Sequence, residues 1–444
     1  MIKTLFFLSF HGGKKALVSL LKTPFRVMFW IAFFAIVYLS RKRRYKINSP
    51  RLLFGPDPIL SNKYWCQALT AYGYKANTLM IEYYASINNK EDYDYYVDEL
   101  FRNSRLLCLL LRYLNLTMPA AFLWAIYNYD IFHIPCHGFL LRGSFLKRYE
   151  HQILSFAKVK VIAKPYGSDF YRYSRVKDPL LLHALLKSYP HAARREAEIE
   201  ENYTYWSRNA DIIIPGIQLD GTGRWDVLPV SVVCIDTKKW APKQSFSGND
   251  GINGEVNIIH TPNHKGFKGT EFIEKAVSEL KEEGLKVRLV LIQGMKNDQV
   301  QEIMVSKADI LVEQIIASGY ALSAIEGMAS SLPVVSNITN GDYLGVFRKY
   351  SYLDECPIVG GNVYNIKEVI RTLVTNPELR KSAGMQARKY VEKYHSFEAY
   401  STLMNKIYDR VWFGKEVSLI NYYEPLNPDS YNNSYEQLKS INNS

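Results

Sequence analysis

The chain of 444 residues is long enough for two or three domains, and 48% of its residues are hydrophobic, which is ample for packed cores. Its formal charge of +12 favours anionic partners such as phosphorylated substrates, anionic lipid or nucleic acid. The five cysteines are scattered without a C-x-x-C spacing, which indicates a reducing compartment and excludes a disulfide framework and a cysteine zinc site.

The first 50 residues form a basic and apolar extension. An unbroken apolar run, residues 27–39, lies between Arg26 and the basic cluster 41–44. This run is shorter than the roughly 20 residues that a helix needs to cross the hydrocarbon core of a membrane. We expect the extension to lie on an anionic membrane surface. The alternatives are a true span and a helix hairpin buried in the first lobe.

The first lobe begins at residue 51. Residues 51–80 predict a strand, a loop containing Gly55, a helix and a second strand. Residues 105–127 are strongly apolar, with Pro119 breaking the run, and predict a buried helix rather than a groove for a lipid acceptor. The next strand, 129–134, ends just before His137. Ligands of open α/β sheets gather beyond the carboxyl ends of the strands, so we expect His137 to take part in chemistry and His133 to lie in the core.

A strand at 159–163 leads into a loop with three candidate acceptor contacts. Gly167 allows a ligand to approach the backbone closely, and Asp169 can accept hydrogen bonds from sugar hydroxyls or cap the next turn. Arg172 is a candidate for holding a phosphorylated acceptor. Farther along, the polar stretch 236–253 predicts a hinge between two lobes.

The second lobe begins with a strand at 256–260. The segment 261–270 then brings Lys265, Lys268 and Gly269 directly before a helix at 271–284. Ammonium groups beside the free N–H groups of a helix start suit a diphosphate, and a solvated basic turn is the alternative. A strand at 287–292 follows, with Gly294 in the loop after it.

Residues 310–338 predict a strand (310–316), a turn, a helix and a second strand (332–338). Gly319 and Tyr320 occupy the turn, and the first N–H groups of the helix are open to an anion. Glu326 lies one turn into the helix on its polar side.

The segment SGYALSAIEGMASSLPVV, residues 318–335, resembles the donor-binding segment of retaining, two-lobed (GT-B) glycosyltransferases of family 4, of the bacterial envelope-polysaccharide type. Its second half matches at residues 326–329 and 332–335. Ser318 stands where the family has a first Glu, and Glu313 is a candidate for a displaced substitute. The resemblance extends over residues 51–411.

The resemblance implies that the second lobe binds a nucleotide sugar and the first lobe an acceptor. The diphosphate would lie at Lys265 and Lys268, the ribose at Glu326 and the base near Gly294. The complete sets are Lys265, Lys268, Gly269, Gly294, Gly319, Tyr320 and Glu326 for donor binding, Gly55, Gly167 and Arg172 for acceptor binding, and Asp169 and His137 for catalysis.

The expected fold class is α/β of the GT-B type, with two doubly wound, Rossmann-like domains facing a cleft. The expected parts are an N-terminal extension (1–50), an acceptor domain (51–240), a linker (241–254), a sugar-nucleotide domain (255–395), a returning helix (396–424) and a disordered tail (425–444).

The implied activity is sugar transfer with retention, without a metal or bound cofactor, to a glycan or lipid-linked acceptor. It would serve cell-envelope polysaccharide synthesis in the cytoplasm, at the inner face of the plasma membrane. The alternative is a non-catalytic nucleotide-sugar or glycan-binding protein on the same fold. The sequence has no zinc-finger, basic-zipper or RNP-type motif, so we expect no nucleic-acid partner.

Overall fold

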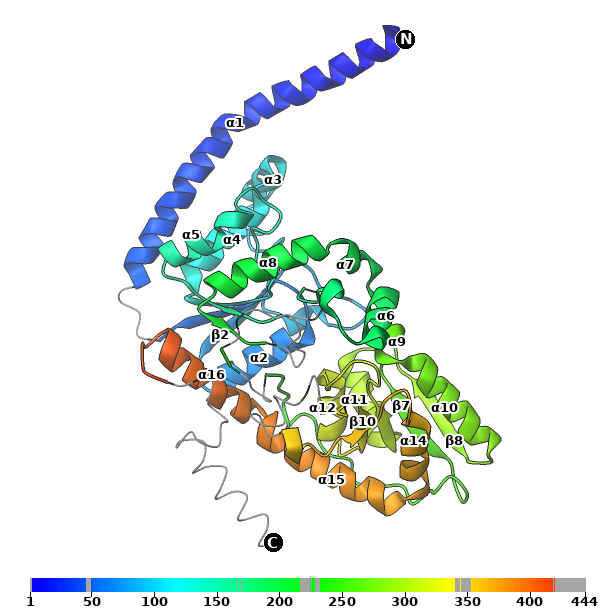
Figure 1. Ribbon diagram of the computed structural model, residues 1–444. Coiled ribbons are helices and arrows are strands. Elements are labelled where there is room, and N and C mark those ends of the chain that lie inside the picture. The colour runs from blue at the N-terminus through cyan, green and yellow to red at the C-terminus, as the bar shows by residue number, and fades with distance from the viewer. Residues whose placement is uncertain are drawn as a thin grey trace.

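The computed structural model describes residues 2–44, 49–165, 169–215, 232–339 and 353–417, with single positions 167, 224, 226, 227, 344 and 419, and it describes side chains from residue 22 onward. It shows two α/β lobes and a long N-terminal helix that projects from the first lobe (Figure 1). The predicted fold class is confirmed by two parallel sheets covered by helices. The predicted tail, 425–444, lies outside the described residues.

The first lobe is built on six parallel strands whose apolar side chains are largely buried, as expected for a sheet covered on both faces. The strand order is β3-β2-β1-β4-β5-β6, so it reverses between β1 and β4. The strands are β1 (Arg51–Phe54), β2 (Lys75–Met80), β3 (Tyr95–Tyr96), β4 (Ile131–Ile134), β5 (Lys160–Ala163) and β6 (Ile212–Ile213). The helices are α2 (Leu60–Ala71), α3 (Arg105–Leu114), α4 (Thr117–Asn128), α5 (Glu150–Phe156), α6 (Pro179–Ser188), α7 (Pro190–Arg194) and α8 (Glu196–Asn209), with short 3-10 turns η1 (Lys90–Asp92), η2 (Lys147–Tyr149) and η3 (Tyr173–Arg175).

The second lobe has a smaller parallel sheet, ordered β11-β10-β9-β7-β8, which reverses between β7 and β9. The strands are β7 (Val256–His260), β8 (Val287–Leu291), β9 (Ile310–Val312), β10 (Val334–Ser336) and β11 (Val359–Gly360). The helices are α9 (Lys265–Lys268), α10 (Thr270–Glu282), α11 (Asn297–Ser306), α12 (Leu322–Ala329), α14 (Ile366–Thr375), α15 (Pro377–Tyr394) and α16 (Phe397–Val411), with a 3-10 turn η4 (Leu353–Glu355). β9 ends at Val312, earlier than predicted, although the Glu313 N–H still donates to the Val335 carbonyl over 2.8 Å, and the side chains of Glu313 and Gln314 bind a lysine.

Two chain segments connect the lobes, and they lie side by side. Ile235, on the way out of the first lobe, forms a parallel bridge with Ser396, on the way back. The Ile235 N–H donates to the His395 carbonyl over 2.8 Å, and His395 Nδ1 lies 2.7 Å from the Val233 carbonyl oxygen. The predicted linker, 241–254, runs along the second lobe, where Lys243 Nζ donates to the Ala308 carbonyl over 2.6 Å.

The returning helix α16 lies on the first lobe against α2. Ser401 Oγ donates to the Ala68 carbonyl over 3.2 Å, and Tyr408 Oη lies 2.9 Å from His133 Nε2. His133 is completely buried, which confirms that it is a core histidine.

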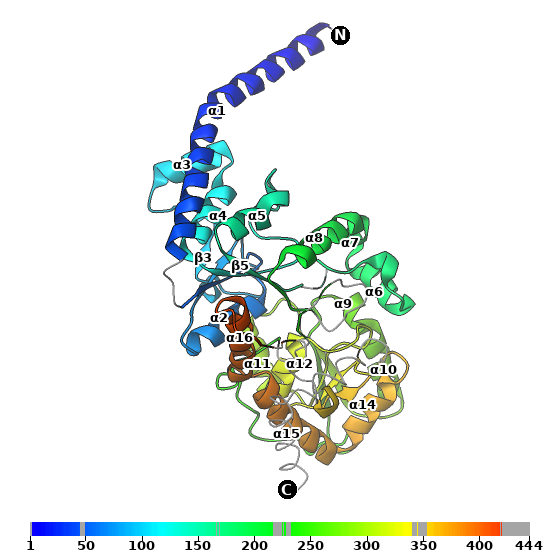
Figure 2. The same cartoon turned by 60° about the vertical axis from the view of Figure 1, so that its left-hand side comes forward.

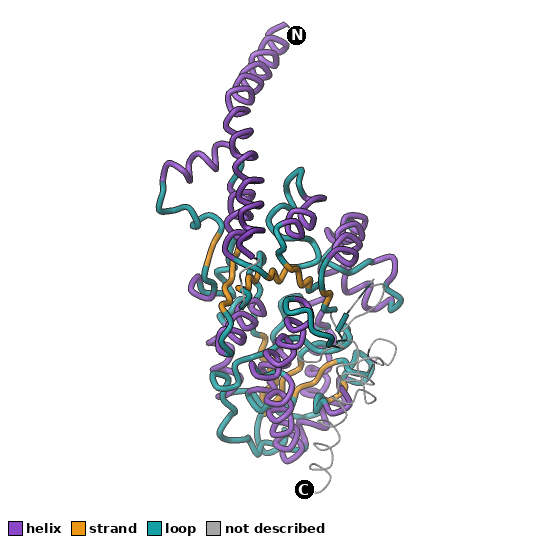
Figure 3. The backbone as a smooth tube through the Cα atoms, turned by 90° about the vertical axis from the view of Figure 1, so that its left-hand side faces the viewer, coloured by secondary structure: helices purple, strands orange, loops and turns teal. Residues whose placement is uncertain are grey.

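The N-terminal extension is one continuous helix, α1 (Ile2–Arg44), so the alternative of a buried helix hairpin is wrong. Its first half points away from both lobes, and its second half packs on α4 and α5 (Figures 2 and 3). The part Lys22–Arg44 is long and apolar enough to cross a membrane, and only 17% of its apolar window is buried. The apolar run 27–39 is therefore the middle of a longer apolar helix.

The single buried helix predicted over residues 105–127 is also wrong. The segment forms two helices, α3 and α4, that meet at an angle of 120°. Asn115 ends α3 in the left-handed conformation (φ 56°), to which asparagine is better suited than most residues. α4 is buried as predicted, whereas Leu106 and Leu109 of α3 are 79% and 58% exposed.

We predict that Gly384→Ala lowers the free energy of unfolding by about 1–3 kcal/mol. A Cβ at Gly384 in α15 would lie 2.1 Å from the Ser331 carbonyl oxygen, just after α12, and backbone atoms relieve such a clash only by moving the two helices apart. Gly248→Ala is the matched control, because a Cβ there meets nothing within 4 Å. Urea unfolding compares the variants, and equal stabilities would contradict the close packing of α15 on α12.

Candidate functional site

Each sheet offers one crevice at the point where its strand order reverses, because the loops leaving the two strands there diverge to opposite faces. In the first lobe these loops follow β1 and β4 and carry Asp57 and His137. In the second lobe they follow β7 and β9 and carry Lys268 and Glu313. Topology alone therefore marks two places for a ligand, and both hold charged side chains.

A cavity of about 510 Å³ lies over the first crevice. His137 Nε2 lies 2.8 Å from Asp57 Oδ2, and its Nδ1 lies 3.7 Å from Asp169 Oδ2. The structure thus brings together the two residues predicted for catalysis. The charged residues that line the cavity are Asp57, His137, Arg142, Lys147, Asp169, Arg195 and Glu198.

Asp57 is held as a carboxylate beside the imidazole. Arg142 Nη1 and Nη2 donate to Asp57 Oδ1 over 3.1 and 3.2 Å. Burial raises the pKa of Asp57, but the neighbouring His137 and Arg142 outweigh it, so the pKa lies below its ordinary value. Neither Asp57 nor Arg142 was named from the sequence as a site residue. Asp57 was detectable, since it lies in the Gly/Pro loop directly after the first strand, whereas nothing local marks Arg142.

Asp169 ties the loop after β5 to the loop after β4, because its Oδ2 accepts from the Cys136 N–H over 2.8 Å. Gly167 precedes it in the left-handed region (φ 94°), where glycine is unstrained. Together these contacts hold an imidazole between two carboxylates, an arrangement able to take a proton from a bound hydroxyl group.

None of the three predicted acceptor residues, Gly55, Gly167 and Arg172, is among those that line this cavity, and two of them are engaged elsewhere. A Cβ at Gly55 would lie 2.1 Å from the Leu79 carbonyl oxygen, so this glycine serves the close approach of two strands. Arg172 is buried, and its Nη1 donates to Glu200 Oε2 over 3.0 Å.

The second crevice contains a buried ion pair. Lys268 Nζ donates to Glu313 Oε1 and, over 2.7 Å, to Gln314 Oε1. Glu313 also accepts from Ser323 Oγ and Ser336 Oγ, each over 3.1 Å, and is 1% exposed. The predicted diphosphate lysine and the candidate substitute for the missing Glu therefore neutralise each other.

The remaining predicted donor residues surround this pair. Lys265 is exposed at the start of α9. Gly269 ends that helix at φ 81°, and a Cβ at this position would meet the Ile315 side chain. Gly319 also has a left-handed φ, 89°. Tyr320 turns its hydroxyl away, to Tyr390 Oη (3.1 Å) and His395 Nε2 (3.0 Å). α12 starts at Leu322, after this turn.

Glu326 lies at the boundary between the lobes. Asn297 Nδ2 donates to its Oε1 over 2.6 Å, and Tyr64 Oη of the first lobe donates to Asn297 Oδ1 over 2.7 Å. Burial raises the pKa of Glu326 to about 8, because one amide hydrogen bond does not replace full hydration. A protonated Glu326 can donate as well as accept a hydrogen bond. Gly294, predicted near the base, lies in the loop after β8 at φ 59°, and a Cβ there would meet nothing within 4 Å.

The loops of the two crevices meet across the lobe boundary. The ring of Tyr171, two residues after Asp169, lies 6.2 Å from the ring of Phe267 in α9. The Phe267 N–H donates to Ser188 Oγ over 2.8 Å at the end of α6. The two crevices therefore open toward a shared boundary.

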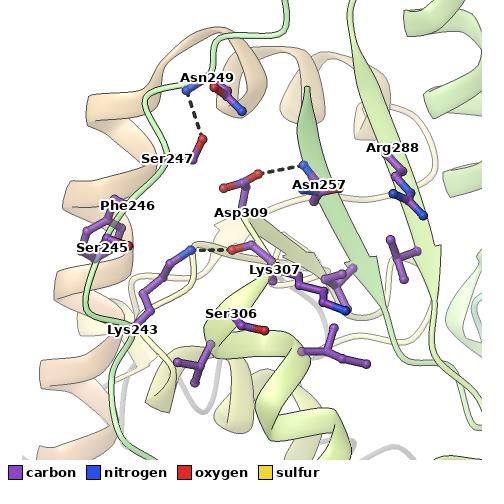
Figure 4. Close-up of a pocket in the computed structure, with 15 residues that line it drawn as sticks. Lys243, Ser245, Phe246, Ser247, Asn249, Asn257, Arg288, Ser306, Lys307 and Asp309 are labelled. Carbon is purple, nitrogen blue, oxygen red and sulfur yellow. Dashed lines mark hydrogen bonds between the residues drawn. The ribbon is translucent and has the colours of Figure 1, made fainter. Parts of the chain in front are cut away.

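A larger groove of about 620 Å³ lies at the opposite, amino end of the second sheet (Figure 4). Asn257 and Arg288 lie near the starts of β7 and β8, and Asp309 directly precedes β9 and accepts from the Asn257 N–H over 2.8 Å. Its position away from the reversal point separates it from both crevices.

No protein-family model matches the chain. The chain is similar to an uncharacterized glycosyltransferase of Methanocaldococcus jannaschii, with 31% identity over 114 residues, which is 26% of this chain and 31% of that protein. Among solved structures, Anabaena HepE in complex with UDP-glucose has a TM-score of 0.46 at 11% identity, over 80% of this chain and 98% of that one. WaaG, a glycosyltransferase involved in lipopolysaccharide biosynthesis, has a TM-score of 0.38 at 13% identity, over 81% and 99%. The match thus spans less than a third of the curated relative, and structural likenesses of this size carry no argument about function.

We predict that Lys268→Met lowers the free energy of unfolding by about 3–5 kcal/mol, because it leaves Glu313 buried without its counter-ion. The double variant Lys268→Met/Glu313→Gln should regain most of that loss, since no charge remains to be compensated. Urea unfolding of the three proteins measures both effects. A double variant no more stable than Lys268→Met would show that the pair is not the source of the loss.

We predict that Glu326→Gln changes the pH dependence of stability. Between the ordinary pKa of 4.5 and the folded value of about 8, the folded chain holds a proton that the unfolded chain releases, so the free energy of unfolding falls as pH rises. Removing this group should stabilise the protein, relative to the wild type, by about 1.4 kcal/mol per pH unit across that window. Unfolding at about pH 5 and about pH 8 measures the difference, with exposed Glu274→Gln as the control. Parallel profiles for wild type and Glu326→Gln would refute the proposed protonation.

Proposed function

We propose that the chain is a retaining glycosyltransferase of the family 4 type that transfers a sugar from a nucleotide sugar to a glycan or lipid-linked acceptor. The observation that carries this proposal is the pair of crevices, one with an exposed lysine and a helix start, the other with an imidazole between carboxylates, which open toward one boundary. The short match to a protein described as a glycosyltransferase supports the same reaction class.

The donor half of the proposal follows from charge. Lys268 is already paired with Glu313, so the cation left for a diphosphate is Lys265, together with the N–H groups at the start of α12. Positive groups fixed before the reaction stabilise the charge that develops on the leaving diphosphate. Glu326 would hold the ribose, and Gly269, Gly294, Gly319 and Tyr320 would shape the site through their backbone.

The acceptor half assigns the chemistry to His137 and its carboxylates. An acceptor hydroxyl oxygen would bond to the anomeric carbon from the same face as the leaving diphosphate, which retains the configuration, while the bond to the diphosphate breaks and its electron pair leaves with the diphosphate. His137 would hold the hydroxyl and take its proton, with Asp57 and Asp169 stabilising the imidazolium. The reaction needs no metal or bound cofactor.

The proposed place of the reaction is the cytoplasmic face of the plasma membrane, in the synthesis of an envelope polysaccharide. The exposed apolar surface and the basic residues of α1 support attachment to an anionic membrane surface.

A second candidate function is nucleotide-sugar or glycan binding without turnover. Its support is local: Ser318 stands in place of an acid, and the carboxylate of Glu313 is occupied by Lys268 and two serines. It predicts nucleotide binding with neither donor hydrolysis nor transfer.

We predict that one of UDP, GDP, ADP or CMP, or its sugar conjugate, raises the melting temperature of the protein. Ligand at about 100 times its Kd adds about 2.7 kcal/mol of stability. Lys265→Ala should weaken binding about tenfold by removing the cation that faces the diphosphate. Lys275→Ala is the matched control, because its side chain is 76% exposed on the neighbouring helix α10.

The same samples separate the two candidate functions. His137→Gln should leave the nucleotide shift intact and lower transfer or donor hydrolysis by about 10²–10⁴-fold. Binding without turnover in the wild type would select the non-catalytic function. The absence of a shift with any nucleotide, in folded protein, would refute both.

A further inference from the structure

The first lobe carries an apolar groove that the proposed reaction does not use. It has a volume of about 480 Å³ and lies between the second half of α1, α3 and α4. Its walls are nearly free of polar atoms, since the residues that line it include Phe29, Ile36, Leu111, Leu123, Trp124 and Tyr127. An apolar space of this kind suits a hydrocarbon chain and not a sugar.

The surface around the groove is apolar as well. Met28 and Ile31 of α1 are each 67% exposed, and Leu106 and Leu109 of α3 are 79% and 58% exposed. Water-soluble monomers rarely expose large apolar side chains in such numbers on adjacent helices. The groove therefore opens within an exposed apolar surface.

Cations stand at both ends of this surface. Arg26 Nη2 donates to the Leu114 carbonyl over 3.2 Å, and Arg43 Nη1 donates to the Tyr127 carbonyl over 3.1 Å. Lys22 and Arg41 likewise bind carbonyl oxygens, and Lys42 lies over the Tyr38 ring. Within the described part of the chain none of these five pairs with a carboxylate, so their charge remains available to an anion.

The distance between the cations along α1 can be compared with the thickness of a membrane. At about 1.5 Å per residue, Arg26 and Arg41 are about 22 Å apart along α1, less than the roughly 30 Å of a hydrocarbon core. Both ends reach the phosphates of one leaflet when this part of the helix lies along the membrane surface, which is the arrangement taken here, although Lys22–Arg44 is also long enough to cross a membrane. In that position the groove faces the acyl region and Arg43 marks its polar mouth.

We propose that the groove between α1, α3 and α4 binds one hydrocarbon chain of an anionic lipid, with the lipid phosphate beside Arg43. This inference rests on the proposed membrane attachment. It adds that one lipid molecule binds at a defined place on the protein. It requires a phosphate because the mouth of the groove is cationic, and an apolar chain because the exposed surface of the walls is almost entirely apolar.

The test uses Trp124, which lines the groove, as a reporter in the full-length protein. Phosphatidylglycerol with brominated acyl chains should quench tryptophan fluorescence, and Trp124→Phe should remove the largest part of that quenching. Ala32→Phe fills the groove and should reduce quenching at least twofold. Ala35→Phe is the matched control, an exposed alanine of the same helix outside the groove lining, and should quench like the wild type.

Vesicle flotation and nucleotide melting shifts are measured on the same proteins. The lipid site is supported if the wild type, Ala32→Phe and Ala35→Phe float equally and quenching is reduced only in Ala32→Phe. Flotation with equal quenching in the two variants would overturn it, and so would equal quenching by brominated phosphatidylcholine. Failure of the wild type to float would refute membrane attachment, whereas the absence of a nucleotide shift would refute the two candidate functions and leave the lipid site standing.

Discussion

The reversal of strand order in each sheet is the constraint on which the two crevices depend. Within a parallel sheet every strand is flanked by neighbours whose connections leave on the same side, and the loops pack against one another. Only between β1 and β4, and between β7 and β9, do the connections part and leave room at the carboxyl edge. Charged groups gather there because water or a ligand can reach them, and because the apolar strands behind them fix their positions.

The two charged centres of the second lobe lower the cost of burial in different ways. Lys268 and Glu313 remain charged and compensate each other, with two serine hydroxyls completing the hydrogen bonds. Glu326 has one amide partner and is neutralised by a proton. Among the described residues around this crevice, Lys265 is the cation left for a dianionic ligand, so helix dipoles and backbone N–H groups there would carry much of its recognition.

Local patterns in the sequence predicted most of the fold and part of the site. Apolar runs placed nearly every strand of both sheets, and the position of His137 after a buried strand placed it at the crevice. The pairing of Lys268 with Glu313 and of Arg172 with Glu200 could not be predicted, because each partner is brought by tertiary packing from a distant segment. A break was expected at Pro119, but that proline lies in the first turn of α4 and the chain turns at Asn115, whose left-handed conformation no local pattern marked.

The two segments that join the lobes form a hydrogen-bonded ribbon, with Ile235 paired to Ser396 and His395 fixed to the carbonyl of Val233. A single tether would allow one lobe to swivel freely about its length. Two tethers that are bonded to each other resist torsion and leave bending across the ribbon as the softest movement. We therefore expect any movement of one lobe against the other to be a bending about this ribbon, and a protease that cuts one segment would leave the lobes joined by the other.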